Sequence, residues 1–157
     1  MFSLRVSQSG NELISSHLLN QETFYDIFAK DLARARHEVI IESPFISFRR
    51  LNYLLPIFCK LARRKVRIII NTKPSEEQAE YGIQTTECIA LLQHLGVEML
   101  ITGGHHRKLA IIDRQILYEG SLNVLSQNDS CEVMRRIQSE QLATQMIDFT
   151  GTGKFLG

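Results

Sequence analysis

Residues 105–123 read His-His-Arg-Lys-Leu-Ala-Ile-Ile-Asp-Arg-Gln-Ile-Leu-Tyr-Glu-Gly-Ser-Leu-Asn. The apolar, partly β-branched run 109–112 lies between two glycines upstream and the polar pair Arg114-Gln115 downstream, which predicts a short strand over residues 108–113. A second apolar run over residues 116–118 follows this polar reversal and is expected to return as the hairpin partner of that strand.

Side chains at alternate positions of a strand share one face. His106 and Lys108 are therefore expected to point to one side of the sheet, and Ser121 and Asn123 are expected to do the same on the returning segment. His105 should point to the opposite face. The pattern predicts that an imidazole, an ammonium and an amide meet in one pocket.

The upstream chain alternates between apolar runs of strand length and segments with helical periodicity. Strands are predicted over residues 2–7, 39–41, 65–71 and 97–101, and helices over residues 20–36 and 51–62 and from residue 85 or 86 to 95. Downstream of residue 123, a strand over residues 131–137 and a closing helix that begins after Ser139 complete the pattern. This alternation predicts an α/β fold with a mixed, largely parallel β-sheet sandwiched between helices.

The length and composition favour one globular domain. The chain has 157 residues, of which 44% are hydrophobic and 22% charged, and a net charge of +1. This composition excludes a disordered chain. The net charge is too small to attract a polyanion by itself, so any surface that binds one must come from local clusters of basic residues. We expect a single domain over residues 1–150 and a flexible tail over residues 151–157.

Cellular location is predicted from the cysteines and from the absence of long apolar runs. Three cysteines, an odd number at wide spacing, fit buried thiols in a reducing compartment better than a disulfide framework. The longest apolar runs reach about half of a membrane span. A cytoplasmic protein without a signal peptide and without stable membrane association is therefore expected.

The spacing His-x-Lys, four residues, Asp, six residues, Gly-Ser-x-Asn resembles the motif of the phospholipase D superfamily. In this chain the motif residues are His106, Lys108, Asp113, Gly120, Ser121 and Asn123. The resemblance implies a phospholipase D-like fold, and it is specific between His106 and Glu132. Ser130 stands where family members often carry Asn, and Arg114 where they often carry Gly.

The chemistry of the motif residues suits an attack on phosphorus. A neutral imidazole is a competent nucleophile near pH 7, which makes His106 the expected nucleophile. Lys108 and Asn123 would hold the non-bridging oxygens of a phosphoryl group, and the resemblance implies that Glu132 holds the imidazole by a hydrogen bond. Neither a metal nor another cofactor is expected, because no cluster with metal-ligand spacing is present.

Three further sets of residues complete the expected site. Ser121 is expected to bind phosphate through its hydroxyl, and Gly120 to allow a close approach of the backbone. Arg49 and Arg50 follow the loop at the carboxyl end of a predicted strand, where ligands of open α/β sheets bind, and are expected to bind substrate. Asp113 ends a strand beside a reversal and is expected to do structural work through an Asx-type turn.

The resemblance implies chemistry that needs two histidines, one that forms a phosphohistidine and one that protonates the leaving oxygen. This chain carries one copy of the motif, so a homodimer that shares its site across a two-fold axis is expected. The family's small single-motif members are mostly nucleases. The leading hypothesis is therefore a metal-independent phosphodiesterase that cleaves nucleic acid, with DNA preferred over RNA, through a covalent intermediate on His106.

Two alternatives stay open at this point. The first is a phospholipid phosphodiesterase or phosphatidyl transferase of the same superfamily, although such members usually carry two motifs. The second is a catalytically inactive module for nucleic-acid binding or dimerisation, detached from a larger helicase or restriction enzyme. The intact set His106, Lys108, Asn123 and Glu132 argues against the second alternative.

Overall fold

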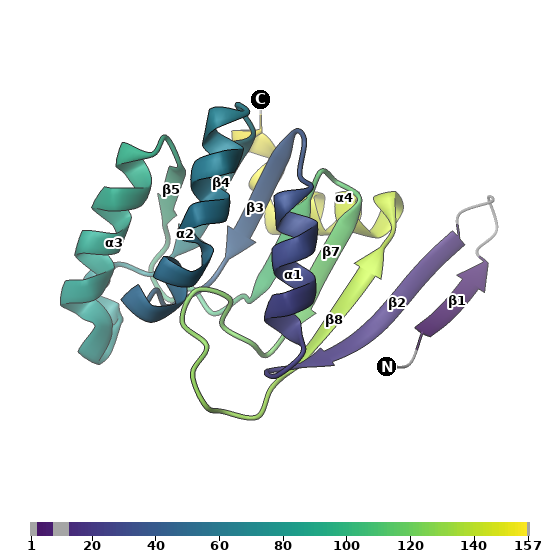
Figure 1. Ribbon diagram of the computed structural model, residues 1–157, viewed down its shortest axis with the longest axis horizontal. Coiled ribbons are helices and arrows are strands. Elements are labelled where there is room, and N and C mark those ends of the chain that lie inside the picture. The colour runs from purple at the N-terminus through teal and green to yellow at the C-terminus, as the bar shows by residue number, and fades with distance from the viewer. Residues whose placement is uncertain (1–2, 8–12, 157) are drawn as a thin grey trace.

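The computed structural model describes residues 3–7 and 13–156, which form one mixed sheet with helices on both faces (Figure 1). The strands are β1 (Ser3–Ser7), β2 (Leu13–Asn20), β3 (Glu38–Glu42), β4 (Arg67–Thr72), β5 (Glu98–Ile101), β6 (Leu109–Ile112), β7 (Ile116–Gly120) and β8 (Val133–Gln138). The helices are α1 (Phe24–Ala33), α2 (Phe48–Arg63), α3 (Gly82–His94) and α4 (Glu140–Thr150), with short 3-10 turns at η1 (Ser75–Glu77), η2 (Ala79–Tyr81) and η3 (Thr152–Phe155).

The sheet has the strand order β1-β2-β8-β7-β6-β3-β4-β5. The α/β class with a mixed, helix-covered sheet is confirmed. The expectation of a largely parallel sheet is corrected, because only the β3–β4 and β4–β5 pairs are parallel and the other pairs are antiparallel. The parallel part comes from the β3-α2-β4-α3-β5 alternation, whereas the hairpin β6–β7 joins β3 in the antiparallel sense.

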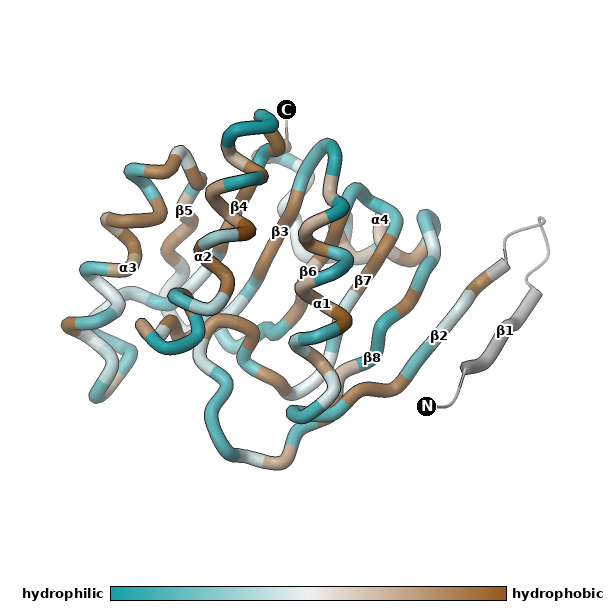
Figure 2. The backbone as a smooth tube through the Cα atoms, viewed as in Figure 1, coloured by the Kyte–Doolittle hydropathy of each residue, from teal (hydrophilic) through white to brown (hydrophobic). Residues whose placement is uncertain are grey.

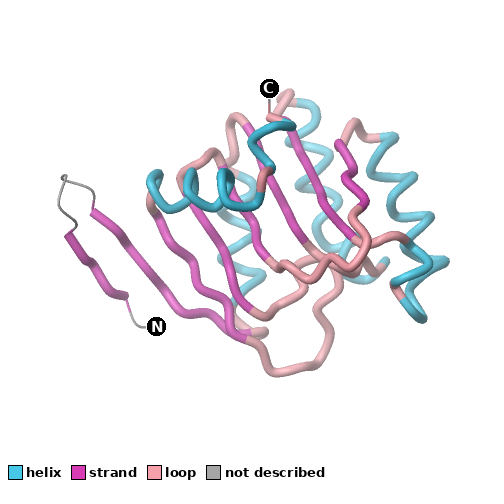
Figure 3. The backbone as a smooth tube through the Cα atoms, turned by 180° about the vertical axis from the view of Figure 1, so that it is seen from behind, coloured by secondary structure: helices cyan, strands magenta, loops and turns pink. Residues whose placement is uncertain are grey.

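Two apolar layers cover the two faces of the sheet. Helices α1, α2 and α3 pack on one face, where Phe28, Leu54 and Phe58 are fully buried against strand residues such as Ile41 and Ile70. Helix α4 crosses the other face, as Figure 3 shows from behind. Figure 2 shows the central strands as the most continuous hydrophobic part of the chain, because both of their faces are buried.

The end of the chain differs from the flexible tail expected over residues 151–157. Residues 152–155 form η3, Leu156 is buried in the α4 layer, and its carbonyl accepts a hydrogen bond of 2.7 Å from the Arg67 guanidinium. Gly151 takes a φ of 75°, which lets the chain reverse after α4. The described part of this segment is therefore packed structure.

One strand and the starts of two helices differ from the prediction. Strand β2 was not expected, and the strand predicted over residues 2–7 is confirmed as β1, with Phe2 outside the described residues. Helix α1 begins after Thr23 and not after Asn20, whose side-chain oxygen accepts hydrogen bonds from the backbone N–H groups of Glu22 and Thr23. Helix α3 begins at Gly82, one turn before the predicted caps at Thr85 or Thr86.

Candidate active site

The ends of several strands bring the motif residues to one edge of the sheet. Leu109, the first residue of β6, pairs with Glu119 near the end of β7 and with Glu42 at the end of β3. Gly120 pairs with Met134 near the start of β8. The segments that carry residues 106–108, 120–123 and 132 therefore meet at this edge, below which the long loop between β7 and β8 lies in Figure 1.

His106 and Lys108 lie side by side just before β6. The Lys108 ammonium donates a hydrogen bond of 2.8 Å to the His106 carbonyl oxygen, and the His106 side chain is exposed. Both residues line a groove of about 540 Å³ together with Gly120. The predicted strand over residues 108–113 is shorter than expected, because regular pairing starts at Leu109, but the two side chains do share one groove.

The charge of Lys108 is only partly compensated. Burial lowers the pKa of the Lys108 ammonium first, the nearby Lys73 ammonium lowers it further, and the Glu132 carboxylate raises it. Among the described residues, no carboxylate lies within ion-pair distance of either lysine. The Lys108 ammonium is therefore influenced by a second ammonium, that of Lys73, and by the Glu132 carboxylate.

Glu132 is the last loop residue before β8 and not a residue of a strand over 131–137. Its backbone N–H donates a hydrogen bond of 2.9 Å to the Gln21 side-chain oxygen, which fixes the approach to β8. Within the described part of the chain, the hydrogen bond expected between the Glu132 carboxylate and the His106 imidazole is not formed. The electrostatic influence on Lys108 nevertheless places Glu132 at the same edge.

Asn123 holds an unused hydrogen-bonding atom. Its backbone carbonyl accepts hydrogen bonds from the N–H groups of Ser126 and Gln127, which turns the loop after β7. Its side-chain Oδ1 is buried and has no hydrogen-bond partner among the described residues. A buried polar atom without a partner is costly, and such atoms are common where a ligand completes the contacts.

Gly120 and Ser121 both contact β8 closely. A Cβ atom on Gly120 would lie 2.2 Å from the Val133 carbonyl oxygen, so only glycine fits here. The backbone N–H of Ser121 donates to that same oxygen at 2.9 Å, and its hydroxyl accepts a hydrogen bond of 3.0 Å from the Val133 N–H. In this structure the Ser121 hydroxyl therefore holds the two strands together.

Arg49 and Arg50 lie at the start of α2 and contact the loop after β7. The Arg50 guanidinium donates to the Gln127 carbonyl at 3.0 and 3.2 Å and stacks on the Tyr25 ring at 3.8 Å. Arg49 donates a hydrogen bond of 2.7 Å to the Asn128 side chain. Neither arginine lines the groove with His106, so the structure separates them from that part of the expected site.

Asp113 lies at the opposite end of the hairpin from His106. Its carboxylate accepts hydrogen bonds of 2.7 to 3.0 Å from the backbone N–H groups of Arg36, His37 and Glu38, which precede or begin β3. The structural role is therefore present, but the interaction is not the local Asx-type turn that the sequence suggested. It is a contact between segments about 76 residues apart in sequence.

His105 is buried, whereas its neighbour His106 is exposed. The Nδ1 atom of His105 accepts a hydrogen bond of 3.2 Å from the Arg107 N–H, and burial lowers the pKa of the ring. Arg107 in turn forms a bidentate ion pair with the buried carboxylate of Glu42, with distances of 2.6 and 2.8 Å. These three residues, together with Lys73, were not expected at the site, because the burial of His105, Glu42 and Lys73 depends on strand neighbours that are distant in sequence.

Neither a cluster of metal ligands nor a membrane-spanning helix is present among the described residues. No three His, Cys, Asp or Glu side chains there are grouped so that they could hold a metal ion. No helix in the same residues has the length and hydrophobicity needed to cross a bilayer.

The family model described as "Cardiolipin synthase, PLD-like domain" matches residues 28–150, which is most of the chain. The chain belongs to the phospholipase D superfamily. No curated protein matches it. The match includes all of the motif residues from His106 to Glu132, so this phospholipase D-like chain carries its single motif within the matched region.

Three solved structures illustrate the fold of this phospholipase D-like chain. NucT from Helicobacter pylori has a TM-score of 0.74 and 18% identity, and the match covers 88% of this chain and 94% of that protein. Nuc from Salmonella typhimurium, a phospholipase D family member, has a TM-score of 0.69 and 14% identity, with 87% and 91% covered. The phosphatidylserine synthase of Haemophilus influenzae Rd KW20 has a TM-score of 0.63 and 11% identity, with 92% of this chain but 39% of the synthase covered.

Proposed function

We propose that this protein is a metal-independent phosphodiesterase that cleaves nucleic acid through a phosphohistidine on His106. The observation that carries the proposal is the groove in which the exposed His106 side chain lies beside Lys108, an ammonium without a carboxylate partner among the described residues. A phosphodiester supplies the negative charge that this groove lacks.

The first step is attack by a neutral His106 imidazole on phosphorus. A nitrogen–phosphorus bond forms, the bond from phosphorus to the leaving oxygen breaks, and a second imidazole, in its protonated form, gives its proton to that oxygen. The Lys108 ammonium and the side-chain NH₂ group of Asn123 donate hydrogen bonds to the non-bridging oxygens, whose charge persists through the transition state. Glu132 acts at the same edge as a carboxylate that orients an imidazole.

The second step consumes water. The second imidazole, now neutral, takes a proton from a water molecule whose oxygen attacks phosphorus, and the nitrogen–phosphorus bond breaks. His106 and the second imidazole return to their starting forms, and the product is a phosphomonoester. Each turnover therefore needs two histidines, of which one chain supplies one.

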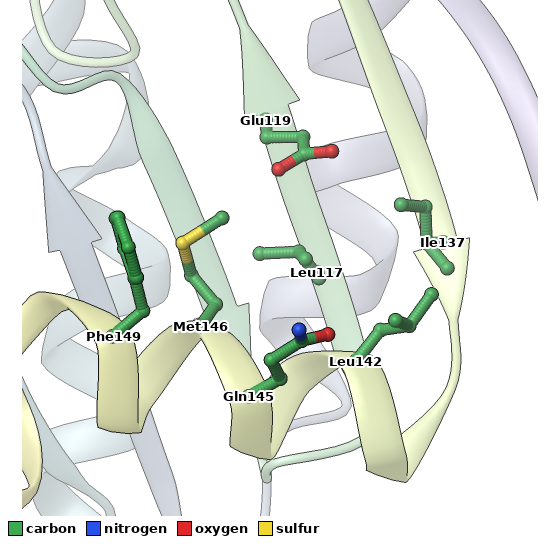
Figure 4. A pocket seen from close by; sticks show the side chains of 7 residues that line it. All are labelled: Leu117, Glu119, Ile137, Leu142, Gln145, Met146 and Phe149. Carbon is green, nitrogen blue, oxygen red and sulfur yellow. The ribbon is translucent and has the colours of Figure 1, made fainter.

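A homodimer would supply the second histidine, and the groove offers a surface for it. Five apolar side chains line the groove that His106 occupies, namely Leu18, Leu109, Val133, Met146 and Phe149, and Phe149 is 85% exposed. Figure 4 shows Met146 and Phe149 on α4 in the neighbouring pocket, which shares these two residues and Glu119 of β7 with the groove. A second copy related by a two-fold axis would cover this apolar surface and bring its own His106 to the site.

The same groove contains the acidic side chain of Glu119 and the basic side chains of Arg107, Lys108 and Arg135. A two-fold interface places the same patch against itself, so a patch with both signs of charge can be self-complementary. This supports a second copy of the chain as the occupant of the groove.

Nucleic acid is the proposed substrate, and DNA is expected ahead of RNA. The chain spans nearly the whole length of Nuc and NucT but less than half of the phosphatidylserine synthase, which supports the small single-motif architecture. All three cysteines are free, which supports a reducing compartment such as the cytoplasm.

A phospholipid phosphodiesterase or phosphatidyl transferase is the second candidate. The observation that favours it is the apolar lining beside His106 and Lys108, because an exposed Phe149 next to a phosphate-binding lysine also suits a lipid headgroup with its acyl chains. The two candidates differ in substrate but share the His106 chemistry.

One experiment separates these functions. Purified protein would be incubated, with chelator present, with labelled single-stranded DNA, duplex DNA, RNA and vesicles that contain a phosphatidyl lipid. We expect cleavage of nucleic acid that chelator does not reduce and that His106→Ala abolishes. Cleavage of lipid alone would select the second candidate. Binding of nucleic acid with no cleavage would indicate an inactive binding module, and a requirement for added Mg²⁺ or Zn²⁺ would contradict the mechanism.

A further inference from the structure

A second lysine lies at the edge of the sheet that carries His106 and Lys108. Lys73 follows β4 and has 8% of its surface exposed, which is unusual for a lysine. No carboxylate among the described residues lies within ion-pair distance of it, and its ammonium lies 4.4 Å from the centroid of the Phe45 ring. A buried ammonium held only by an aromatic face is costly unless an anion completes its surroundings.

The strand register explains why Lys73 and Lys108 lie close to each other. Glu42 of β3 pairs with Leu109 of β6 on one side and with Asn71 of β4 on the other. Lys108 precedes Leu109 and Lys73 follows Asn71 by two residues, so both lysines leave the sheet at the same edge. They are two strands apart, or roughly 10 Å between backbones, a separation that two lysine side chains can span.

The backbone around Lys73 is held firmly. Its N–H donates a hydrogen bond of 3.3 Å to the Pro44 carbonyl, and its own carbonyl accepts one of 2.8 Å from the Gln78 side chain. Gln78 is fully buried and also accepts hydrogen bonds from the Ile46 N–H and the Thr85 hydroxyl. This network fixes the segment over residues 73–78 and thereby fixes where the Lys73 side chain starts.

We propose that Lys73 is a phosphate-binding residue of this site and that its ammonium and that of Lys108 hold the same phosphoryl group. The inference rests on the proposed phosphodiesterase site and adds a residue that lies outside the His-x-Lys motif. An anion between the two ammonium groups removes the repulsion between them and gives the buried Lys73 a charged partner. The rigid backbone of residues 73–78 means that little conformational freedom is lost when phosphate binds.

The test uses inorganic phosphate as the probe and measures its affinity by isothermal titration and by NMR of the lysine side chains. Lys73→Met removes the charge but keeps an unbranched side chain that can pack on Phe45. We expect the affinity for phosphate to fall about tenfold or more, the loss of one charge-assisted contact. Lys73→Arg keeps the charge and should retain most of the affinity.

Lys154→Met is the matched control. The Lys154 ammonium also lies over an aromatic ring, that of Phe155 at 5.2 Å, but η3 packs near Arg67 at the other end of β4. The same substitution there should leave the affinity for phosphate within about twofold, because the removed charge is distant from the site.

A second readout separates binding from a purely structural role. Because the Lys73 charge lowers the pKa of Lys108, and Glu132 is the other charged group that acts on it, Lys73→Met should raise the pKa of Lys108. The alkaline limit of phosphate binding should then move to higher pH even as the affinity at neutral pH falls. Thermal unfolding of each variant would establish that it is folded.

A folded Lys73→Met protein whose phosphate affinity stays within twofold of the wild type would overturn the inference. This outcome is distinguishable from failure of the proposed function, because the assay needs no turnover. Tight phosphate binding that depends on Lys73 in a protein that cleaves no nucleic acid would support the inference and reject the nuclease. Cleavage that is unaffected by Lys73→Met would reject the inference alone.

Discussion

The two ends of the β6–β7 hairpin carry parts of the same motif but treat their polar groups in opposite ways. At the turn end, the Asp113 carboxylate accepts three backbone hydrogen bonds and Arg114 forms an ion pair of 2.6 Å with Glu38. At the open end, within residues 3–7 and 13–156, the Lys108 ammonium forms a hydrogen bond only to a carbonyl of its own segment and the Asn123 Oδ1 has no hydrogen-bond partner. The difference indicates that the turn end stabilises the fold and that the open end is kept for a ligand.

The backbone at the turn end is also conformationally strained. Asp113 and Arg114 have φ angles of 53° and 54°, in the left-handed region that glycine favours. The Gln115 N–H donates to the Ile112 carbonyl at 3.0 Å, which closes a two-residue hairpin turn of the type that needs such angles. The hydrogen bonds of Asp113 offset this strain.

The largest expected effect is a loss of catalytic rate from a substitution at the open end. His106→Ala should lower the rate of phosphodiester cleavage at least a thousandfold, because it removes the nucleophile, and should change the free energy of unfolding by less than about 0.5 kcal/mol, because the side chain is exposed. The measurements are single-turnover cleavage and chemical denaturation.

His105→Ala is the control for this variant. It removes a buried ring and a hydrogen bond to Arg107, so we expect a loss of stability of about 1 to 2 kcal/mol with most activity retained. Equal loss of activity in the two variants would mean that the assignment of the nucleophile is wrong.

The next largest effect is a loss of stability expected from a substitution at the turn end. Asp113→Ala removes the acceptor of three backbone N–H groups and should lower the free energy of unfolding by about 2 kcal/mol, or roughly 4 to 8 °C in Tm, with the activity per folded molecule unchanged. A comparison of thermal unfolding with kcat at low temperature would check this. A large loss of kcat in a protein of normal stability would assign Asp113 to the chemistry.

The smallest effect is expected for Arg114→Gly. Glycine relieves the left-handed strain, whereas loss of the ion pair with Glu38 costs little because the Arg114 side chain is 51% exposed. The two contributions oppose each other, so the free energy of unfolding should change by less than about 1 kcal/mol. A loss above 2 kcal/mol would show that the ion pair, and not the carboxylate of Asp113, holds the turn end.

The sequence predicts well where a local pattern decides the structure. The isoleucine runs of β3 and β4 predict buried strands, and the polar pair after Asp113 predicts the reversal of the hairpin. Ser139 caps α4 as expected, through a hydrogen bond of 3.0 Å from the Leu142 N–H. Strand β2 was missed because its sequence LISSHLLN follows neither period, although Ile14 and Leu19 are buried.

The sequence predicts poorly where long-range pairing decides burial. Nothing in residues 73–78 indicates that Gln78 is fully buried or that Lys73 is almost so, because both depend on the neighbouring β3 loop. The antiparallel insertion of β6 beside β3 likewise has no local signal. The spacing of the motif identified His106 and Lys108, whereas the contacts that occupy Ser121 and Arg50 became visible only in the structure.

We propose that the open end of the β6–β7 hairpin forms half of a phosphodiesterase site and that a second copy of the chain supplies the other half. Wild-type protein would be mixed with increasing fractions of His106→Ala protein under conditions of subunit exchange that are verified independently by mass spectrometry. If two copies share each site, activity should fall as the square of the wild-type fraction, to about one quarter at equal mixing. A linear fall, to about one half at equal mixing, would contradict the shared site and would require a second general acid within one chain.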